Sequence, residues 1–371
     1  MSADESHNGW PEAVGVNLAY YRLSHVDQAS GYDQLPRYLA GAARVRMVEP
    51  SLPRRMPEAI SARLGNSRRL AFYEPAGLRL EYAVLRRLLE APDEVCHLMY
   101  AEDHFNHLAH VRRLPRRLRG ALVGTFHQPP GRFEAVVRFP DLEHRLRALD
   151  AAIVLSRDQA DFLGGLMPPE RVHLVPHGVN ADHFRPREAP APGPVRCLAV
   201  GSWLRDFALL RAVIDRVVGA DPSISFEVLT KPEDLGEIAA TPGTTVRAGI
   251  SSEALLASYR AAHIFVHPVV AAAANNALVE ATASGLPIVA TRTGGVPEYV
   301  GDDCAVLTPP GDVEAMAAAI LDLARDPGRR ARMALAARQT ALALDWPAIS
   351  RKTLGVYSAA LRVRAAALGD L

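Results

Sequence analysis

The segment His263–Val300 combines a strand end, a loop of small residues and a helix start, an arrangement that can bind an anion. It reads HIFVHPVVAAAANNALVEATASGLPIVATRTGGVPEYV. We expect a buried strand to end at His267–Pro268, and a helix capped by Asn275 or Asn276 to end at Gly285. A helix start beyond the carboxyl end of a strand offers unpaired N–H groups and a positive dipole end. The segment therefore predicts a phosphate site.

Glu280 lies one turn inside the same predicted helix. Its carboxylate could accept hydrogen bonds from the two vicinal hydroxyls of a ribose, as acidic residues do in dinucleotide-binding folds. The alternative is that Asn275 is only a cap and that Glu280 is a solvated helix residue. Apolar residues on both sides of Glu280 favour a buried position.

Further polar residues come directly after predicted strands, where open α/β sheets bind ligands. His127 follows the strand in ALVGTFHQPP and could hydrogen-bond a ligand, or be satisfied by a local carbonyl. Glu102, Asp103 and His104, in MYAEDHF, could recognise a substrate or be solvated loop residues. Arg205 follows another strand and could contact a phosphate or form an ordinary surface ion pair.

Short apolar runs, separated by amphipathic stretches of helical period, must position these residues. Such alternation is typical of doubly wound α/β sheets. The runs exceed one comfortable sheet, so two domains are expected. They span residues 14–20, 95–100, 121–126, 151–155, 172–175, 195–200, 226–229, 263–266, 287–290 and 304–307.

The domain break is expected in RPREAPAPGP, residues 185–194, because its prolines cannot continue a helix or a central strand. The sequence therefore predicts a first domain over residues 1–187 and a second over residues 188–345. Residues 346–371 are expected to form a C-terminal helix that crosses back to the first domain.

The composition of the 371 residues, 49% hydrophobic and 22% charged, is that of a globular protein. The formal net charge of +1 argues against a nucleic-acid partner bound through bulk electrostatics. Cys96, Cys197 and Cys304 match no metal spacing and lie in apolar runs, which predicts buried free thiols. No signal peptide is recognised in Met1–Pro11, and no apolar stretch is long enough to span a membrane. We expect a cytoplasmic protein.

The run NNALVEATASGLPIVATRTGGVPEYV resembles the donor-site signature of family 4 glycosyltransferases, which are retaining enzymes of the GT-B fold. That signature has a glutamate, seven residues and a second glutamate, then small residues, Gly-x-Pro-Val and a Gly-Gly loop. The resemblance implies that Glu280 binds the donor ribose and that backbone N–H groups around Asn276 and Ala277 hold the distal phosphate. Gly294–Gly295 would form the loop. The first glutamate, which contacts the donor sugar in the family, falls on Ala272.

The resemblance extends over most of the chain and implies further donor contacts. Gly249–Ile250 would lie against the nucleobase through backbone groups, and Gly31 would approach the donor phosphates. His127 takes the place of a histidine beside the donor sugar. In the family, two cations also clamp the diphosphate. In this sequence Ser202 stands in place of the first, and Arg205 is the only cation available to act as the second. His127 and Arg205 are therefore the candidate catalytic residues.

The resemblance implies two Rossmann-like doubly wound domains facing across a cleft, with Glu102, Asp103 and His104 on the acceptor side. It implies transfer of a sugar from a UDP- or GDP-linked donor to an unknown hydroxyl acceptor, with retained configuration and without a metal or other cofactor. Two alternatives remain. One is another GT-B enzyme, such as an epimerase or a phosphorylase; Ala272 argues against the epimerase, which would need carboxylates around the hexose. The other is a non-catalytic protein that binds a nucleotide sugar or a partner, which Ala272 and Ser202 favour.

The run VRRLPRRLRG, residues 111–120, places five arginines around Leu114 and Leu118. It could contact an anionic membrane that carries a lipid acceptor. The alternative is a solvated helix face, in which Pro115 would interrupt any long helix.

Overall fold

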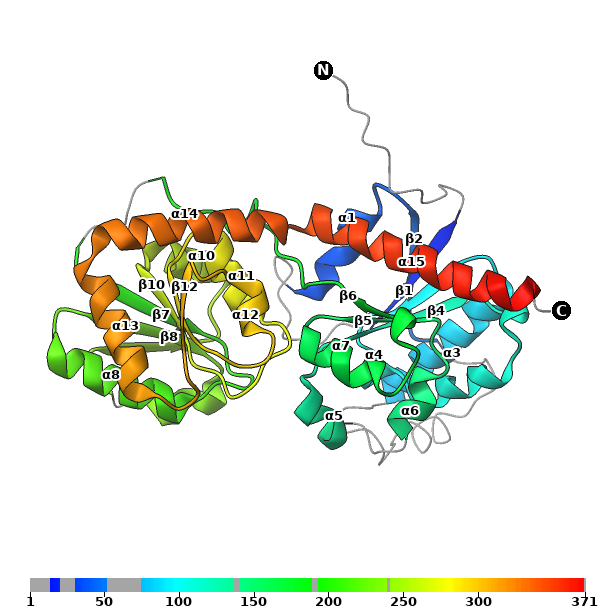
Figure 1. The fold of residues 1–371 in the computed structure, drawn as a ribbon, viewed down its shortest axis with the longest axis horizontal. Coiled ribbons are helices and arrows are strands. Elements are labelled where there is room, and N and C mark those ends of the chain that lie inside the picture. Colours follow the sequence, from blue (N-terminus) through cyan, green and yellow to red (C-terminus); the bar gives the residue numbers. More distant parts are fainter. Residues whose placement is uncertain are drawn as a thin grey trace, which may run out of the picture. The chain divides into compact units, whose positions relative to one another are not determined.

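The computed structural model describes residues 14–20, 31–51, 75–136, 141–188, 193–238 and 241–369. The chain divides into two compact units (Figure 1). Unit 1 comprises residues 1–26, 32–176 and 347–371, and unit 2 comprises residues 27–31 and 177–346.

Unit 1 is built on a six-stranded parallel sheet of order β2-β1-β3-β4-β5-β6. The chain changes direction across the sheet between β1 and β3. The strands are β1 (Gly15–Ala19), β2 (Arg44–Val48), β3 (Val95–Leu98), β4 (Ala121–Phe126), β5 (Ala151–Val154) and β6 (Val172–Leu174). The helices are α1 (Leu35–Leu39), α3 (Pro75–Glu90), α4 (Ala101–His104), α5 (Pro130–Val136), α6 (Asp141–Leu146), α7 (Arg157–Gly164) and α15 (Trp346–Gly369).

Unit 2 has the same architecture, with a six-stranded parallel sheet of order β12-β11-β10-β7-β8-β9. Here the direction of winding reverses between β7 and β10. The strands are β7 (Arg196–Val200), β8 (Ser225–Thr230), β9 (Thr244–Ala248), β10 (Ile264–His267), β11 (Ile288–Thr291) and β12 (Ala305–Thr308). The helices are α8 (Phe207–Ala220), α9 (Leu235–Ile238), α10 (Ser252–Ala261), α11 (Asn276–Ala283), α12 (Val296–Tyr299), α13 (Val313–Arg325) and α14 (Pro327–Ala343).

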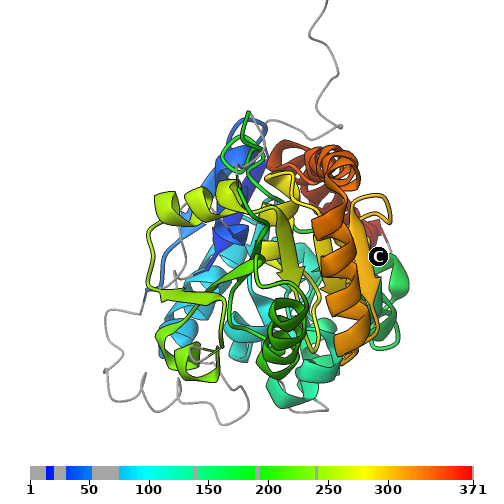
Figure 2. The same cartoon turned by 90° about the vertical axis from the view of Figure 1, so that its left-hand side faces the viewer.

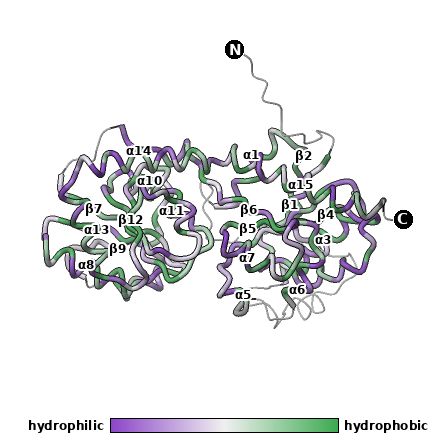
Figure 3. Tube along the Cα trace, viewed as in Figure 1, coloured by the Kyte–Doolittle hydropathy of each residue, from purple (hydrophilic) through white to green (hydrophobic). Residues whose placement is uncertain are grey.

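Helices cover both faces of each sheet, as a doubly wound fold requires. In unit 2 the helices α8 and α13 pack on one face, and α10, α11 and α14 enclose the core on the other (Figure 2). In unit 1 one face packs on α3 and α7, and the other carries His97, which hydrogen-bonds Tyr357 of α15. Hydrophobic segments lie in the interior of each unit (Figure 3). The α/β fold expected from the sequence is confirmed in both units.

Two strands, β2 and β9, were not expected from the sequence. Each lies at an edge of its sheet, with charged or polar side chains exposed in alternation. An edge strand that is buried on one side only has no continuous apolar run, which is the pattern by which the interior strands are recognised.

The expected domain boundary after residue 187 lies later than the division seen in the structure. Residues 177–188 group with unit 2. The backbone of Val179 exchanges hydrogen bonds of 3.0 and 3.1 Å with Leu344 and Trp346, and the Arg338 guanidinium donates to the carbonyls of Ala181 and Phe184. The proline-rich segment, of which residues 189–192 lie outside the described residues, therefore follows the start of unit 2. Residues 347–371 group with unit 1.

Candidate active site

The start of α11 lies at the point of unit 2 where the winding of the sheet reverses, beyond the carboxyl ends of β7 and β10. Ligands of open α/β sheets bind at such points. Of the two candidate caps, the structure selects Asn275, whose Oδ1 accepts the N–H of Leu278 at 3.3 Å. The helix ends at Gly285, which has a positive φ of 70°. The N–H of the next residue, Leu286, donates to the carbonyl of Ala281.

Glu280 is buried, with 4% of its surface exposed, so it is not the solvated helix residue of the alternative interpretation. The Tyr259 hydroxyl donates to Glu280 Oε2 at 2.9 Å. A narrow cavity, too small to hold a water molecule, adjoins Glu280 and Asn276. Gly31, which groups with unit 2, and His177 also line this cavity. Glu280 is therefore a fixed acceptor at the wall of a cavity.

Arg205 is held beside the start of α11 by bonds within the protein. Its Nε and Nη2 donate to the carbonyl of Val200 at 2.9 and 2.6 Å, and Nη2 donates to Asn275 Oδ1 at 3.1 Å. Burial lowers the pKa of Arg205 to about 10, against the opposing electrostatic effect of Tyr259 and Glu280. No ion pair joins Arg205 to Asp206 among the described residues, because Asp206 caps α8 instead. Arg205 thus places positive charge at the N-cap of α11.

The Gly294–Gly295 loop packs directly against Ala272. Gly294 has a φ of 47°, and a Cβ there would lie 2.1 Å from the Ala272 carbonyl oxygen, so only glycine fits. The Gly295 N–H donates to the same carbonyl at 2.9 Å. Ala272, which stands in place of the expected glutamate, is itself buried at 5% exposure.

Gly249 and Ile250 form the turn between β9 and α10. Gly249 is exposed with a φ of 62°, Ile250 is half-buried, and Ser251 caps α10. The backbone of this turn is therefore available to a ligand at the end of the sheet.

His127 lies in unit 1 directly after β4, and its ring is held by neighbours. Nε2 donates to the Met99 carbonyl at 2.9 Å, and the ring stacks on Tyr100 at a centroid distance of 4.5 Å. His127 therefore has a local carbonyl as a hydrogen-bond partner, as the alternative interpretation proposed. This carbonyl fixes the hydrogen of the neutral ring on Nε2.

Glu102 and Asp103 are not solvated loop residues. Glu102 is 1% exposed, and its Oε1 accepts the N–H groups of His127 and Gln128 at 2.6 and 2.9 Å. Burial, reinforced by Asp103, raises the pKa of Glu102 to about 8, and burial raises that of Asp103 to about 7. Burial lowers the pKa of His104 to about 4. Glu102 therefore shapes the loop that carries His127.

Two residues of unit 2 escaped the sequence interpretation. Tyr259 is fully buried, and its hydroxyl orients Glu280. The signal in the sequence was a tyrosine in a predicted core helix, because a buried tyrosine hydroxyl needs a polar partner. His267, the last residue of β10, is fully buried, and neither ring nitrogen has a hydrogen-bond partner among the described residues. Burial, reinforced by the Arg205 charge, lowers the pKa of His267 well below its usual range.

The arginine-rich run at residues 111–120 does not form an amphipathic helix. It folds as two short 3-10 segments, His107–Arg113 and Arg116–Leu118. Arg119 is buried and pairs with Asp150 at 2.6 Å. Part of this positive charge is therefore structural, which neither interpretation of the run anticipated.

The predicted residues thus fall into two sets. Unit 2 gathers Arg205 and the donor-site residues from 272 to 295 around the start of α11, and unit 1 gathers His127 with Glu102, Asp103 and His104 after β3 and β4. The three cysteines are buried free thiols, as expected. In the part of the chain that the structure describes, no cluster of His, Cys, Asp or Glu could hold a metal ion, and no helix could cross a membrane.

Comparison with known proteins gives a consistent family for this arrangement. Residues 198–326 match the family described as Glycosyl transferases group 1, and residues 32–183 match Glycosyltransferase Family 4. The chain therefore belongs to the group 1 glycosyltransferases of the GT-B fold.

Individual relatives are more distant. The chain is 32% identical over 221 residues to MMP alpha-(1->4)-mannosyltransferase of Mycolicibacterium hassiacum, covering 56% of this chain and 53% of the relative. It is 31% identical to D-inositol 3-phosphate glycosyltransferase of Streptomyces avermitilis, covering 58% and 53%. The chain spans about half the length of these curated relatives. Sucrose-phosphate synthase of Thermosynechococcus elongatus shares the fold, with a TM-score of 0.67, 19% identity and coverage of 93% and 98%.

Proposed function

We propose that this protein transfers a sugar from a UDP- or GDP-linked donor to a hydroxyl acceptor, with retained configuration. The observation that carries the proposal is the buried carboxylate of Glu280 beside the start of α11. In a doubly wound sheet this combination of helix N-terminus and acidic residue suits a nucleoside diphosphate.

In this proposal each donor group has a partner in unit 2. The ribose hydroxyls donate to Glu280, which the Tyr259 hydroxyl holds in place. The backbone N–H groups of Asn276 and Ala277 receive the distal phosphate, and Arg205 adds positive charge beside them. Gly249–Ile250 contacts the base through its backbone, and Gly31 approaches the phosphates.

The proposed reaction is a front-face displacement. The bond between the anomeric carbon and the distal phosphate oxygen breaks, and the bond from the acceptor oxygen to the same face of that carbon forms. The acceptor proton passes to the departing phosphate. Arg205 and the α11 dipole stabilise the charge that develops on the phosphate, so no metal is required in this proposal.

The remaining contacts, to the donor sugar and to the acceptor, are proposed for residues of unit 1. His127 is proposed to hydrogen-bond the donor sugar. Glu102, Asp103 and His104 are proposed to shape the acceptor side, where the raised pKa of the buried Glu102 carboxyl favours its protonated form, which can donate as well as accept hydrogen bonds. The curated relatives are named for transfer of mannose and for glycosylation of D-inositol 3-phosphate, so a polyhydroxyl acceptor is the first class to test.

The replacement at Ala272 guides the choice of donor. A methyl group cannot hold the far hydroxyls of a hexose as a glutamate would. We therefore propose a donor that does not need this grip, such as a pentose or deoxysugar, or one held by another residue.

A panel of UDP- and GDP-sugars, scored by nucleotide release and by calorimetric affinity, tests the proposal. Glu280→Ala should weaken nucleotide binding by more than about 100-fold, since two hydrogen bonds to a charged group contribute on the order of 3 kcal/mol. Glu314→Ala, at a 71% exposed side chain, is the matched control and should bind as wild type does. Equal binding by the Glu280 variant would place the donor elsewhere.

A non-catalytic role in binding a nucleotide sugar is the second candidate. The internal bonds of Arg205, together with Ala272 and Ser202, favour it, because they reduce the contacts left for the reacting sugar. Nucleotide binding that depends on Glu280, without turnover of any donor, would support this candidate over transfer.

A further inference from the structure

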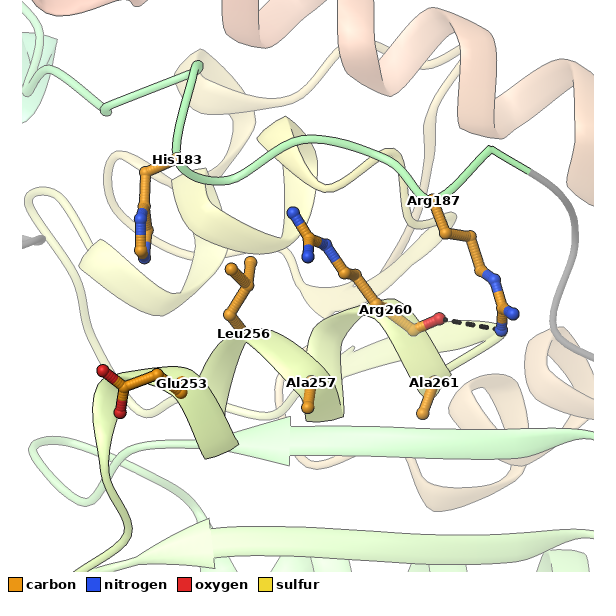
Figure 4. Close-up of a pocket in the computed structure, with 7 residues that line it drawn as sticks. All are labelled: His183, Arg187, Glu253, Leu256, Ala257, Arg260 and Ala261. Carbon is orange, nitrogen blue, oxygen red and sulfur yellow. Dashed lines mark hydrogen bonds between the residues drawn. The ribbon is translucent and has the colours of Figure 1, made fainter.

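A second opening in unit 2 lies between α10 and residues 183–187 (Figure 4). It is a groove of about 540 Å³, within the range of roughly 300–1,000 Å³ typical of small-molecule sites. It shares no lining residue with the cavity at Glu280. Leu256 and Arg260 line it from the partly exposed face of α10, whereas Tyr259 is fully buried. The groove is therefore distinct from the proposed donor site.

Two arginines supply positive charge to the groove. Arg187 Nη1 donates to the Arg260 carbonyl at 3.3 Å, and the Arg260 side chain extends along the middle of the groove (Figure 4). No carboxylate pairs with either guanidinium among the residues described, and Arg260 Nε is buried without a hydrogen-bond partner there. A cation in the last turn suits the α10 dipole. That dipole does not account for a second, unpaired arginine beside it.

The other end of the groove is polar. His183 and Glu253 lie there on opposite walls, with Leu256 between them (Figure 4). His183 Nε2 is buried and has no partner among the described residues. Two arginines against one glutamate leave the lining with a net positive charge, so the groove favours an anion that also carries hydrogen-bonding groups.

We propose that this groove binds a phosphate-bearing small molecule. The phosphate bonds the Arg260 guanidinium, because a guanidinium binds phosphate oxygens through two parallel N–H groups, and Arg187 adds positive charge at the same groove. The hydroxyl-bearing part extends over Leu256 towards His183 and Glu253. This binding is independent of sugar transfer at the other site.

Titration calorimetry at constant ionic strength, with inorganic phosphate and glucose 6-phosphate as probes, tests the site. Wild type should bind glucose 6-phosphate more tightly than inorganic phosphate. Arg260→Leu should weaken both about tenfold or more. Arg332→Leu, at an exposed arginine of α14, should bind both probes as wild type does. Glu280→Ala should also retain phosphate binding, although it loses nucleotide.

Several results would overturn the proposal. These are no binding of either probe at millimolar concentration, unchanged binding by Arg260→Leu, or loss of phosphate binding in Glu280→Ala alone. Co-sedimentation with phosphatidylglycerol vesicles, without binding of glucose 6-phosphate, would assign the groove to a lipid headgroup instead. Thermal unfolding checks that each variant is folded. If Arg260→Leu is not folded, Arg187→Leu, at an exposed side chain, carries the same test.

Discussion

Replacement of Tyr259 by phenylalanine tests whether Glu280 is held ready for a ribose. The Tyr259 hydroxyl donates to Glu280 Oε2 at 2.9 Å and lies 3.3 Å from the Ala277 carbonyl oxygen, and the ring is fully buried. A hydrogen bond to a charged group contributes about 1.5–3 kcal/mol, so Tyr259→Phe should lower the free energy of unfolding by about that amount. Urea denaturation measures this loss.

The effect on nucleotide binding should be smaller and separate. Without the hydroxyl, the Glu280 side chain is held by fewer contacts, and the additional ordering when the ribose binds costs up to about 0.5–1.5 kcal/mol. The dissociation constants of UDP and GDP should therefore rise roughly 2- to 10-fold. Calorimetry of Tyr259→Phe, Glu280→Gln and the double variant should give a coupling energy of about 0.5 kcal/mol or more, because the two groups are in contact.

Tyr357→Phe is the matched control, since Tyr357 is equally buried and its hydroxyl lies 2.7 Å from His97 Nδ1 in unit 1. It should lose stability but keep its nucleotide affinity. Equal affinity of Tyr259→Phe and wild type, or additive effects in the double variant, would refute the positioning of Glu280 by Tyr259.

Four further predictions address other groups of the two sites. His127→Ala should lower turnover while nucleotide affinity stays the same, because the proposed nucleotide contacts lie in unit 2; full turnover would leave His127 a structural residue. Glu102→Gln keeps an acceptor for two N–H groups and removes the charge. Because the Glu102 pKa is raised to about 8, the free energy of unfolding of this variant relative to wild type should rise by up to about 1.4 kcal/mol per pH unit between pH 5 and pH 8. Urea denaturation at several pH values measures this difference, and a difference that does not change with pH would contradict the prediction. His267→Leu should raise stability by about 1–3 kcal/mol, since it removes buried nitrogens without partners, and a lower melting temperature would count against it. Ala272→Glu should shift donor preference towards glucose and mannose, and strong wild-type turnover of UDP-glucose would remove the basis for that shift.

The sequence predicted all the interior strands and the edge strands β6 and β12, but not the edge strands β2 and β9. Strands such as β4 and β10 are buried on both faces and read as continuous apolar runs. The edge strands β2 and β9 lack such runs because only part of each is buried. The domain boundary could not be found from local sequence either, because residues 177–188 join unit 2 through contacts with Arg338 and Leu344, more than 150 residues away.

The same distinction holds for the candidate site. The caps of α11 were predictable, since Asn275 and Gly285 act on neighbouring backbone groups. Partners distant in sequence were not: the carboxylate of Glu280 meets Tyr259 across 21 residues, and Arg205 meets Asn275 across 70. For this reason residue types could indicate a phosphate and a ribose, whereas the pairing of their ligands required the fold.

The electrostatics at the start of α11 give the strongest physical argument for an anion there. The positive end of the helix dipole, the Arg205 guanidinium and the neutral His267 ring all lie at the reversal point of one sheet. A guanidinium beside a helix N-terminus is unfavourable unless negative charge balances it, and the Arg205 charge adds to the burial that keeps the pKa of His267 low. The Asn275 oxygen and the Val200 carbonyl provide only dipoles, and Tyr259 shares the Glu280 carboxylate. A bound diphosphate would add negative charge where the Arg205 guanidinium and the positive end of the α11 dipole meet, so nucleotide binding should raise the melting temperature of wild type more than that of Arg205→Leu.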